Sequence, residues 1–91
     1  MDDGKRFSRL VTIELSAEGK RKGVTQRSLA EAMGIGATQF SLYLAGRRGA
    51  MTVATLVRAC EYLGIAPEVI VQRAYQALLD EGRADQASPS A

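Results

Sequence analysis

The segment Val24–Arg48, VTQRSLAEAMGIGATQFSLYLAGRR, constrains the fold of this chain more than any other part of the sequence. Thr25 can accept a hydrogen bond from the free amides at a helix N-terminus, and Gly34 suits the left-handed residue that closes a helix. We therefore predict a short helix over residues 26–33 and, after a tight glycine turn, a second short helix over residues 37–45.

Apolar residues recur at helical spacing in the rest of the chain. A first helix is expected over residues 5–20, and Thr52 is a cap for a fourth helix. Pro67 suits the first turn of a fifth helix, which should run to about Glu81 and end at Gly82. The core-facing stripe expected on the fourth helix consists of Val53, Leu56, Val57, Cys60 and Leu63. The sequence thus predicts an all-α fold of five helices.

A chain of 91 residues is expected to form one domain, here residues 1–82. Residues 83–91 are rich in Ser, Ala, Asp and Pro and lack a large apolar residue, so we expect them to form a flexible tail. No apolar run approaches the roughly 18 residues that would span a bilayer, and the pattern of a secretory signal is missing. A cytoplasmic protein without a membrane partner is expected.

The chain contains one cysteine and no histidine. Cys60 has no partner for an internal disulfide, and its place on an apolar stripe favours a buried structural thiol over a reactive one. Histidine is the usual general base and a common metal ligand. We therefore expect no enzymatic activity, no metal and no cofactor.

Basic residues concentrate in the middle of the chain, where residues 20–48 carry six of them against the single acid Glu31. Phosphate contacts supply most of the non-specific affinity for duplex DNA, so this stretch is typical of a DNA footprint. From charge alone, a merely solvated basic surface is the alternative. The basic candidates for phosphate contact are Lys20, Arg21, Lys22, Arg27, Arg47 and Arg48.

The predicted helix over residues 37–45 has two chemically different faces at 100° per residue. Phe40, Tyr43 and Leu44 gather on one face and should pack inward. The other face carries Thr38, Ser41, Leu42 and Ala45. This second face is free to meet DNA, where hydroxyls can pair with several bases and a methyl can pack on thymine.

These residues resemble the helix-turn-helix of the Cro and lambda-repressor family, in its repressor type. The resemblance spans residues 24–65 and is carried by Thr25-Gln26, Leu29-Ala30, Met33-Gly34, Phe40, Gly46 and the segment Leu56–Leu63 followed by Gly-Ile. It implies a five-helix bundle whose third helix reads DNA, and symmetric dimers that bind operators with two half-sites.

The resemblance also implies roles for individual residues. Gln26 matches a glutamine that contacts phosphate at the start of the second helix. The positions that touch base edges are Ala37, Thr38, Ser41 and Leu42, with Gln39 on the flank of that surface as a reader of adenine or as a solvated side chain. Ala37 and Ala45 depart from the glutamine and asparagine common in the family, so the operator sequence cannot be transferred.

The predicted last helix carries more apolar residues than one stripe needs. If Ile70, Ala74 and Leu78 face the core, then Val71, Tyr75 and Leu79 face a second copy of the chain; the reverse assignment and a helix fully buried in a monomer are the alternatives. The expected homodimer interface comprises Val71, Tyr75 and Leu79, together with Leu78, which would face the second copy in the reverse assignment. Two-fold pairing would set the reading helices about 34 to 36 Å apart.

The leading hypothesis is a sequence-specific transcriptional regulator of double-stranded DNA, a phage or bacterial repressor that binds its operator as a dimer. No small-molecule ligand is implied. The alternative is a protein-interaction module on the same fold, antitoxin-like or coactivator-like, with weak or secondary DNA binding. The scarcity of strong base-reading side chains keeps this alternative open.

Overall fold

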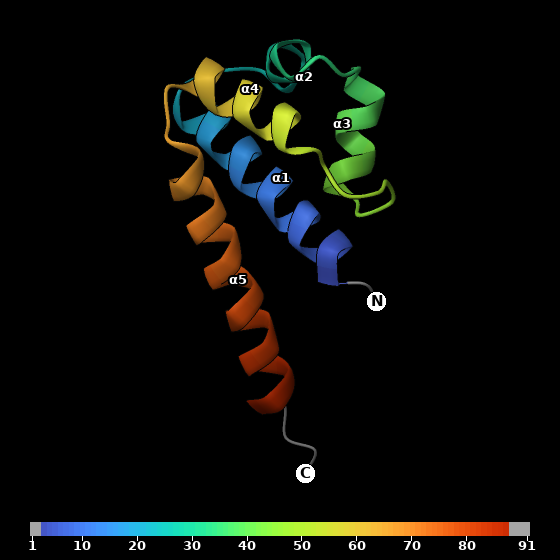
Figure 1. Cartoon of the computed structure of the whole chain (residues 1–91), viewed down its shortest axis with the longest axis vertical. Helices are drawn as coiled ribbons and strands as arrows, with labels where there is room; N and C mark the ends of the chain where they lie inside the picture. Colours follow the sequence, from blue (N-terminus) through green and yellow to red (C-terminus); the bar gives the residue numbers. More distant parts are fainter. Residues whose placement is uncertain (1–2, 88–91) are drawn as a thin grey trace.

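The computed structural model describes residues 3–87, and this part of the chain forms five helices. They are α1 (Asp3–Arg21), α2 (Gln26–Met33), α3 (Ala37–Leu44), α4 (Val53–Leu63) and α5 (Pro67–Ala87). Figure 1 shows α1 in the middle of the bundle, with α2 and α4 at its upper end, α3 on one side and α5 on the other. The predicted all-α fold is confirmed.

The ends of α2 and α4 follow from local sequence chemistry. Thr25 caps α2 by accepting a hydrogen bond from the Ser28 N–H at 3.1 Å. Thr52 caps α4 in the same way, accepting from the Thr55 N–H at 3.1 Å. Gly34 closes α2 at φ +77°, a left-handed conformation that costs glycine little because it has no Cβ.

The core draws residues from every helix. Burying a large apolar side chain contributes about 1.5–3 kcal/mol, so a few such residues supply much of the stability of a small domain. The largest fully buried apolar side chains are Leu15 of α1, Leu29 and Met33 of α2, Phe40 of α3, Cys60 of α4 and Ile70 of α5.

The inward face of α4 differs from the predicted stripe. Cys60 and Leu63 are buried as expected, but Val53 is 75% exposed, whereas Thr55 and Ala59 are buried. The predicted stripe was chosen for large apolar residues, so it omitted Thr55 and Ala59. Small side chains at these positions allow another helix to approach closely, and α4 packs mainly against α2. The expected core position of Val53 was therefore wrong.

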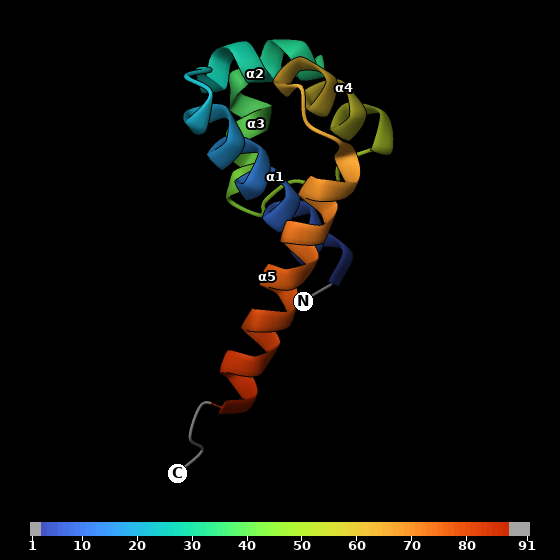
Figure 2. The ribbon, with the colours of Figure 1, turned by 90° about the vertical axis from the view of Figure 1, so that its left-hand side faces the viewer.

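The last helix also differs from the prediction, because α5 continues through Gly82 to Ala87. Gly82 does not adopt a positive φ, so it does not close the helix, and one glycine in a helix interior costs only about 1 kcal/mol relative to alanine. Figures 1 and 2 show the second half of α5 extending beyond the other helices. The predicted tail thus begins inside a helix, and residues 88–91 lie outside the described residues.

Candidate nucleic-acid interface

The two faces of α3 are divided as the sequence predicted. Phe40 is 1% exposed and Tyr43 is 8% exposed, and both point into the protein. Thr38 and Ser41 are exposed, and Leu42 is half-buried. Folding therefore leaves a face of short polar and apolar side chains open to solvent along α3.

Two further predicted base readers lie at the start of α3. Ala37 is exposed. Gln39 is half-buried, and its Oε1 accepts a hydrogen bond from the Gly36 N–H at 3.2 Å. Gln39 thus caps the N-terminus of its own helix, and this bond occupies one of the two lone pairs of the oxygen that would accept from adenine.

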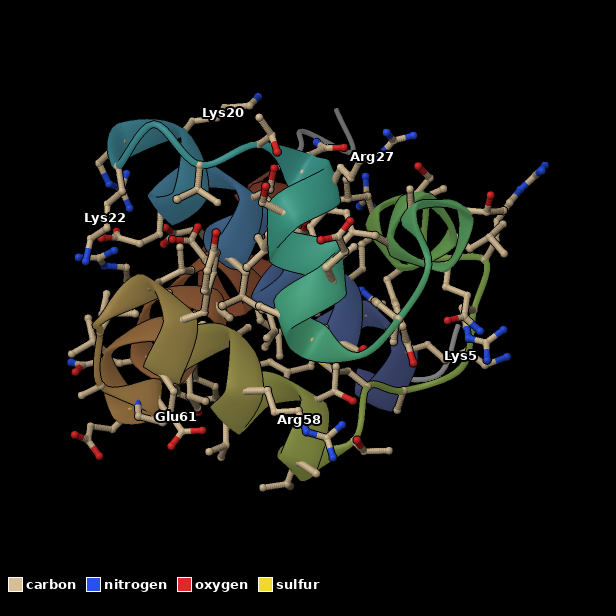
Figure 3. The ribbon with its side chains drawn as sticks, turned by 90° about the horizontal axis from the view of Figure 1, so that it is seen from above. Lys5, Lys20, Lys22, Arg27, Arg58 and Glu61 are labelled. Carbon is tan, nitrogen blue, oxygen red and sulfur yellow. The ribbon has the colours of Figure 1, made fainter. Side chains whose placement is uncertain are left out.

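The start of α2 carries exposed polar and basic side chains. Gln26 is exposed, and its Nε2 donates a hydrogen bond to Ser16 Oγ on α1 at 3.4 Å. Lys20 and Arg27 are also exposed, and Figure 3 shows both at the edge of the molecule where α2 begins. The free amides of the first turn of α2 add partial positive charge at the same edge.

The loop after α3 presents Arg47 and Arg48 to solvent. The Arg48 guanidinium lies 5.8 Å from the centroid of the Tyr43 ring, within the range of a cation–π contact. The backbone N–H of Arg47 donates to the Leu42 carbonyl at 2.9 Å, which ties the loop to the last turn of α3. Both arginines therefore extend from a backbone anchored to α3.

Two of the predicted phosphate contacts are engaged within the chain. Arg21 Nη2 lies 2.6 Å from Glu18 Oε1, and Arg73 of α5 lies 3.0 Å from the same oxygen. Lys22 Nζ donates to the Leu63 carbonyl at the end of α4 and lies 3.7 Å from Glu18 Oε2. Hydrogen bonds from Arg21 and Arg73 hold the pKa of Glu18 below its usual value.

This arrangement separates the basic residues onto two sides. Figure 3 shows Lys22 beside α4, across the molecule from α3, whereas Arg27 lies on the α3 side of α2. Lys22 and Arg27 were predicted to contact the same DNA backbone because they are close along the chain.

Sequence reasoning missed two basic residues of α1 that lie near the end of α3. Lys5 and Arg9 line a cavity together with Ala45 and Gly46, and Figure 3 shows Lys5 on the α3 side of the molecule. Both residues belong to the predicted first helix, but nothing local in the sequence indicates that this helix passes the end of α3.

The outer face of α5 follows one of the two assignments considered from sequence. Ile70 and Ala74 are fully buried, whereas Tyr75 is 54% and Leu79 is 38% exposed. Val71 is half-buried. Leu78 packs partly against the core, whereas Val71, Tyr75 and Leu79 do not. Among the predicted dimer residues, Leu78 therefore lies nearest to the inner face of α5.

Three further features of the described residues concern the cysteine, possible metal ligands and membrane-spanning helices. Cys60 is buried, and burial raises the pKa of its thiol, as fits a structural residue. No group of three or more potential metal ligands occurs within residues 3–87. In the same part of the chain, none of the helices combines the length and apolar character needed to cross a membrane.

The comparisons with known proteins agree with this geometry. A family model described as a helix-turn-helix domain matches residues 15–71. The crystal structure of the clp gene regulator ClgR from Corynebacterium glutamicum is similar, with a TM-score of 0.77 and 25% identity, covering 90% of this chain and 87% of that chain. A second ClgR crystal structure has a TM-score of 0.69 and 25% identity, covering 78% and 91%. No curated protein matches the sequence.

Proposed function

Because the chain belongs to the helix-turn-helix domain family, whose model matches residues 15–71, we propose that it is a transcriptional regulator that binds double-stranded DNA sequence-specifically. The observation that carries the proposal is the exposed face of α3, with Thr38 and Ser41 open to solvent while Phe40 and Tyr43 hold the helix on the core. This face would lie in the major groove, where hydroxyls and methyl groups meet base edges. The likeness to a structure described as a gene regulator supports the same function.

The DNA backbone would be held on both sides of that face. Arg47 and Arg48, which follow α3, and Gln26 and Arg27, which begin α2, are exposed. Lys20 extends the basic edge at the start of α2. Such contacts set register and affinity without reading sequence. Arg21 and Lys22 contribute less, because their charges are engaged by Glu18.

Binding as a homodimer through α5 would match an operator with two half-sites. The exposed apolar side chains Tyr75 and Leu79, with half-buried Val71 beside them, form an outer stripe that a second copy would cover. The part of α5 that extends beyond the bundle also favours a partner, since isolated helical segments are marginally stable in water. In this proposal the protein acts in the cytoplasm of a bacterium, encoded by it or by a phage, as a non-enzymatic repressor that occludes a promoter.

A protein-interaction module on the same fold is the second candidate. It is favoured by the short side chains of the α3 face and by the engagement of Gln39 with Gly36, because strong direct readout usually uses long side chains with two hydrogen bonds.

Selection of bound sequences from a random duplex library at about 0.15 M salt decides between the two candidates. A regulator that binds as a dimer should select an inverted repeat. Binding without any consensus would instead favour the interaction module.

Substitutions then assign the residues. Arg47→Ala and Arg48→Ala should weaken binding to all duplexes and reduce the salt slope by about 0.9 for each phosphate that the protein no longer neutralises. Thr38→Ala and Ser41→Ala should alter sequence preference at a nearly unchanged salt slope. Arg58→Ala removes an exposed arginine of α4 that lies near Gly34, at the opposite end of α2 from Arg27 (Figure 3), and should leave binding unchanged. If the arginine substitutions and the hydroxyl substitutions reduced sequence preference equally, the assignment of phosphate contacts and base readers would be contradicted.

A further inference from the structure

The side chain of Arg9 in α1 holds the C-terminal end of α3. Its Nε–H donates to the carbonyl oxygen of Leu44, the last residue of α3, at 3.1 Å. Carbonyls in the last turn of a helix lack partners within the helix, and a cation there also interacts favourably with the helix dipole. The aliphatic part of Arg9 covers the next turn, since a Cβ built on Gly46 would lie 2.9 Å from Arg9 Cδ.

Neighbouring residues of the same helical turn make two further contacts between elements. Ser8 is buried, and its Oγ accepts a hydrogen bond from the Met51 N–H at 2.7 Å. Arg6 forms an ion pair with Glu81 of α5 at 3.0 Å. Residues 6–9, which we call the α1 brace, therefore connect α5, the end of α3 and the start of α4.

The brace holds both ends of the loop that presents the candidate phosphate contacts. Leu44 precedes this loop and Met51 follows it, and both are hydrogen-bonded to the brace. Arg47 and Arg48 lie between them. Residues 6–9 and Glu81 also lie outside residues 15–71, so these contacts are additional to the matched family unit.

We propose that Arg9 is a positioning residue for DNA recognition, which sets the orientation of α3 and of the Arg47–Arg48 loop through its bond to Leu44 instead of contacting DNA itself. This inference rests on the proposed function. A change in helix orientation affects base contacts, which need defined geometry, more than contacts to phosphates, which tolerate movement. Loss of the bond should therefore reduce discrimination between sequences more than it reduces general affinity.

The test compares Arg9→Met and Arg9→Lys with the wild-type protein. Binding to the duplex selected from the library and to a scrambled duplex is measured over a range of salt concentrations. Arg9→Met keeps an aliphatic chain without the donor. It should lower the ratio of the two affinities by about fivefold, the factor equivalent to the net free energy of one hydrogen bond, at an unchanged salt slope. Arg9→Lys retains a donor and should restore most of the ratio. Arg58→Met is the matched control for loss of one exposed arginine and should not change the ratio.

Hydrogen exchange of the free protein provides a readout that does not depend on DNA. The amides of Ala45, Gly46 and Arg47 donate to carbonyls in the last turns of α3. Their exchange should become faster in Arg9→Met, while that of α2 amides stays unchanged. If wild-type protein showed no sequence preference, the proposed function would fail. Unchanged exchange would separately show that Arg9 does not hold α3.

Two other results would overturn the positioning role. Equal weakening on both duplexes, with the salt slope reduced by about 0.9, would make Arg9 a phosphate contact. If Arg9→Met lowered the melting temperature but kept the full ratio of the two affinities, the role of Arg9 would be purely structural.

Discussion

Gly46→Ala tests how tightly the turn after α3 is packed against α1. Gly46 has φ +71°, and a left-handed conformation costs an alanine about 1–2 kcal/mol. The new Cβ would lie 2.9 Å from Arg9 Cδ, which is too close, so the Arg9 side chain must move and its bond to Leu44 would break. Such a bond contributes about 0.5–1.5 kcal/mol. The free energy of unfolding should therefore fall by about 1.5–3.5 kcal/mol.

Gly23→Ala is the matched control for this substitution. Gly23 has a nearly identical φ of +72°, but a Cβ there would meet nothing within 4 Å. Its cost should be that of the backbone alone, about 1–2 kcal/mol. Because both substitutions restrict the unfolded chain equally, that effect cancels in the comparison.

Urea unfolding followed by circular dichroism measures both costs, and each 1 kcal/mol should also lower the melting temperature by about 4–8 °C in a domain of this size. In an Arg9→Ala background, the cost of Gly46→Ala should fall to that of Gly23→Ala. If the two glycine substitutions cost the same in the wild-type background, the contact with Arg9 contributes nothing and the reasoning is refuted.

Two further substitutions test the ion pairs that Glu18 forms with Arg21, Lys22 and Arg73, and the end of the last helix. The pKa of Glu18 is lowered in the folded protein, so its contribution to stability is present above the usual value of 4.5 and is lost as pH falls through the lower, folded value. Glu18→Gln should therefore be less stable than wild type at neutral pH, with a smaller difference in acid; a gap in the urea midpoint that stayed constant with pH would contradict this. Gly82→Ala should raise the free energy of unfolding by about 0.5–1 kcal/mol, since Gly82 lies inside α5 with open space around its Cα. Destabilisation by this alanine would mean that the helix ends there in a left-handed turn.

Local patterns in the amino-acid sequence determined the secondary structure near the site. Thr25 and Gly34 mark the ends of α2 because capping depends on bonds between residues a few positions apart. The division of α3 into an inner face with Phe40 and an outer face with Ser41 follows from helical geometry alone. Such features do not depend on the rest of the fold, so they were predictable without it.

Patterns of large apolar residues were less reliable away from the site. Val53 was predicted to be buried, but Thr55 and Ala59 occupy the inner face of α4 instead. How closely two helices approach depends on the shapes of both, and a single sequence segment does not contain that information.

Only the tertiary structure decided which basic residues face the proposed DNA surface. Arg21 and Lys22 lie within the basic stretch of the sequence, yet they are engaged by Glu18 on another side of the molecule. Arg9 lies outside that stretch, yet it contacts the last residue of α3. A long charged side chain binds whatever carboxylate or helix end the packing brings within its reach. Its partner therefore depends on how distant helices cross, whereas a helix cap or an amphipathic face depends on neighbours along the chain.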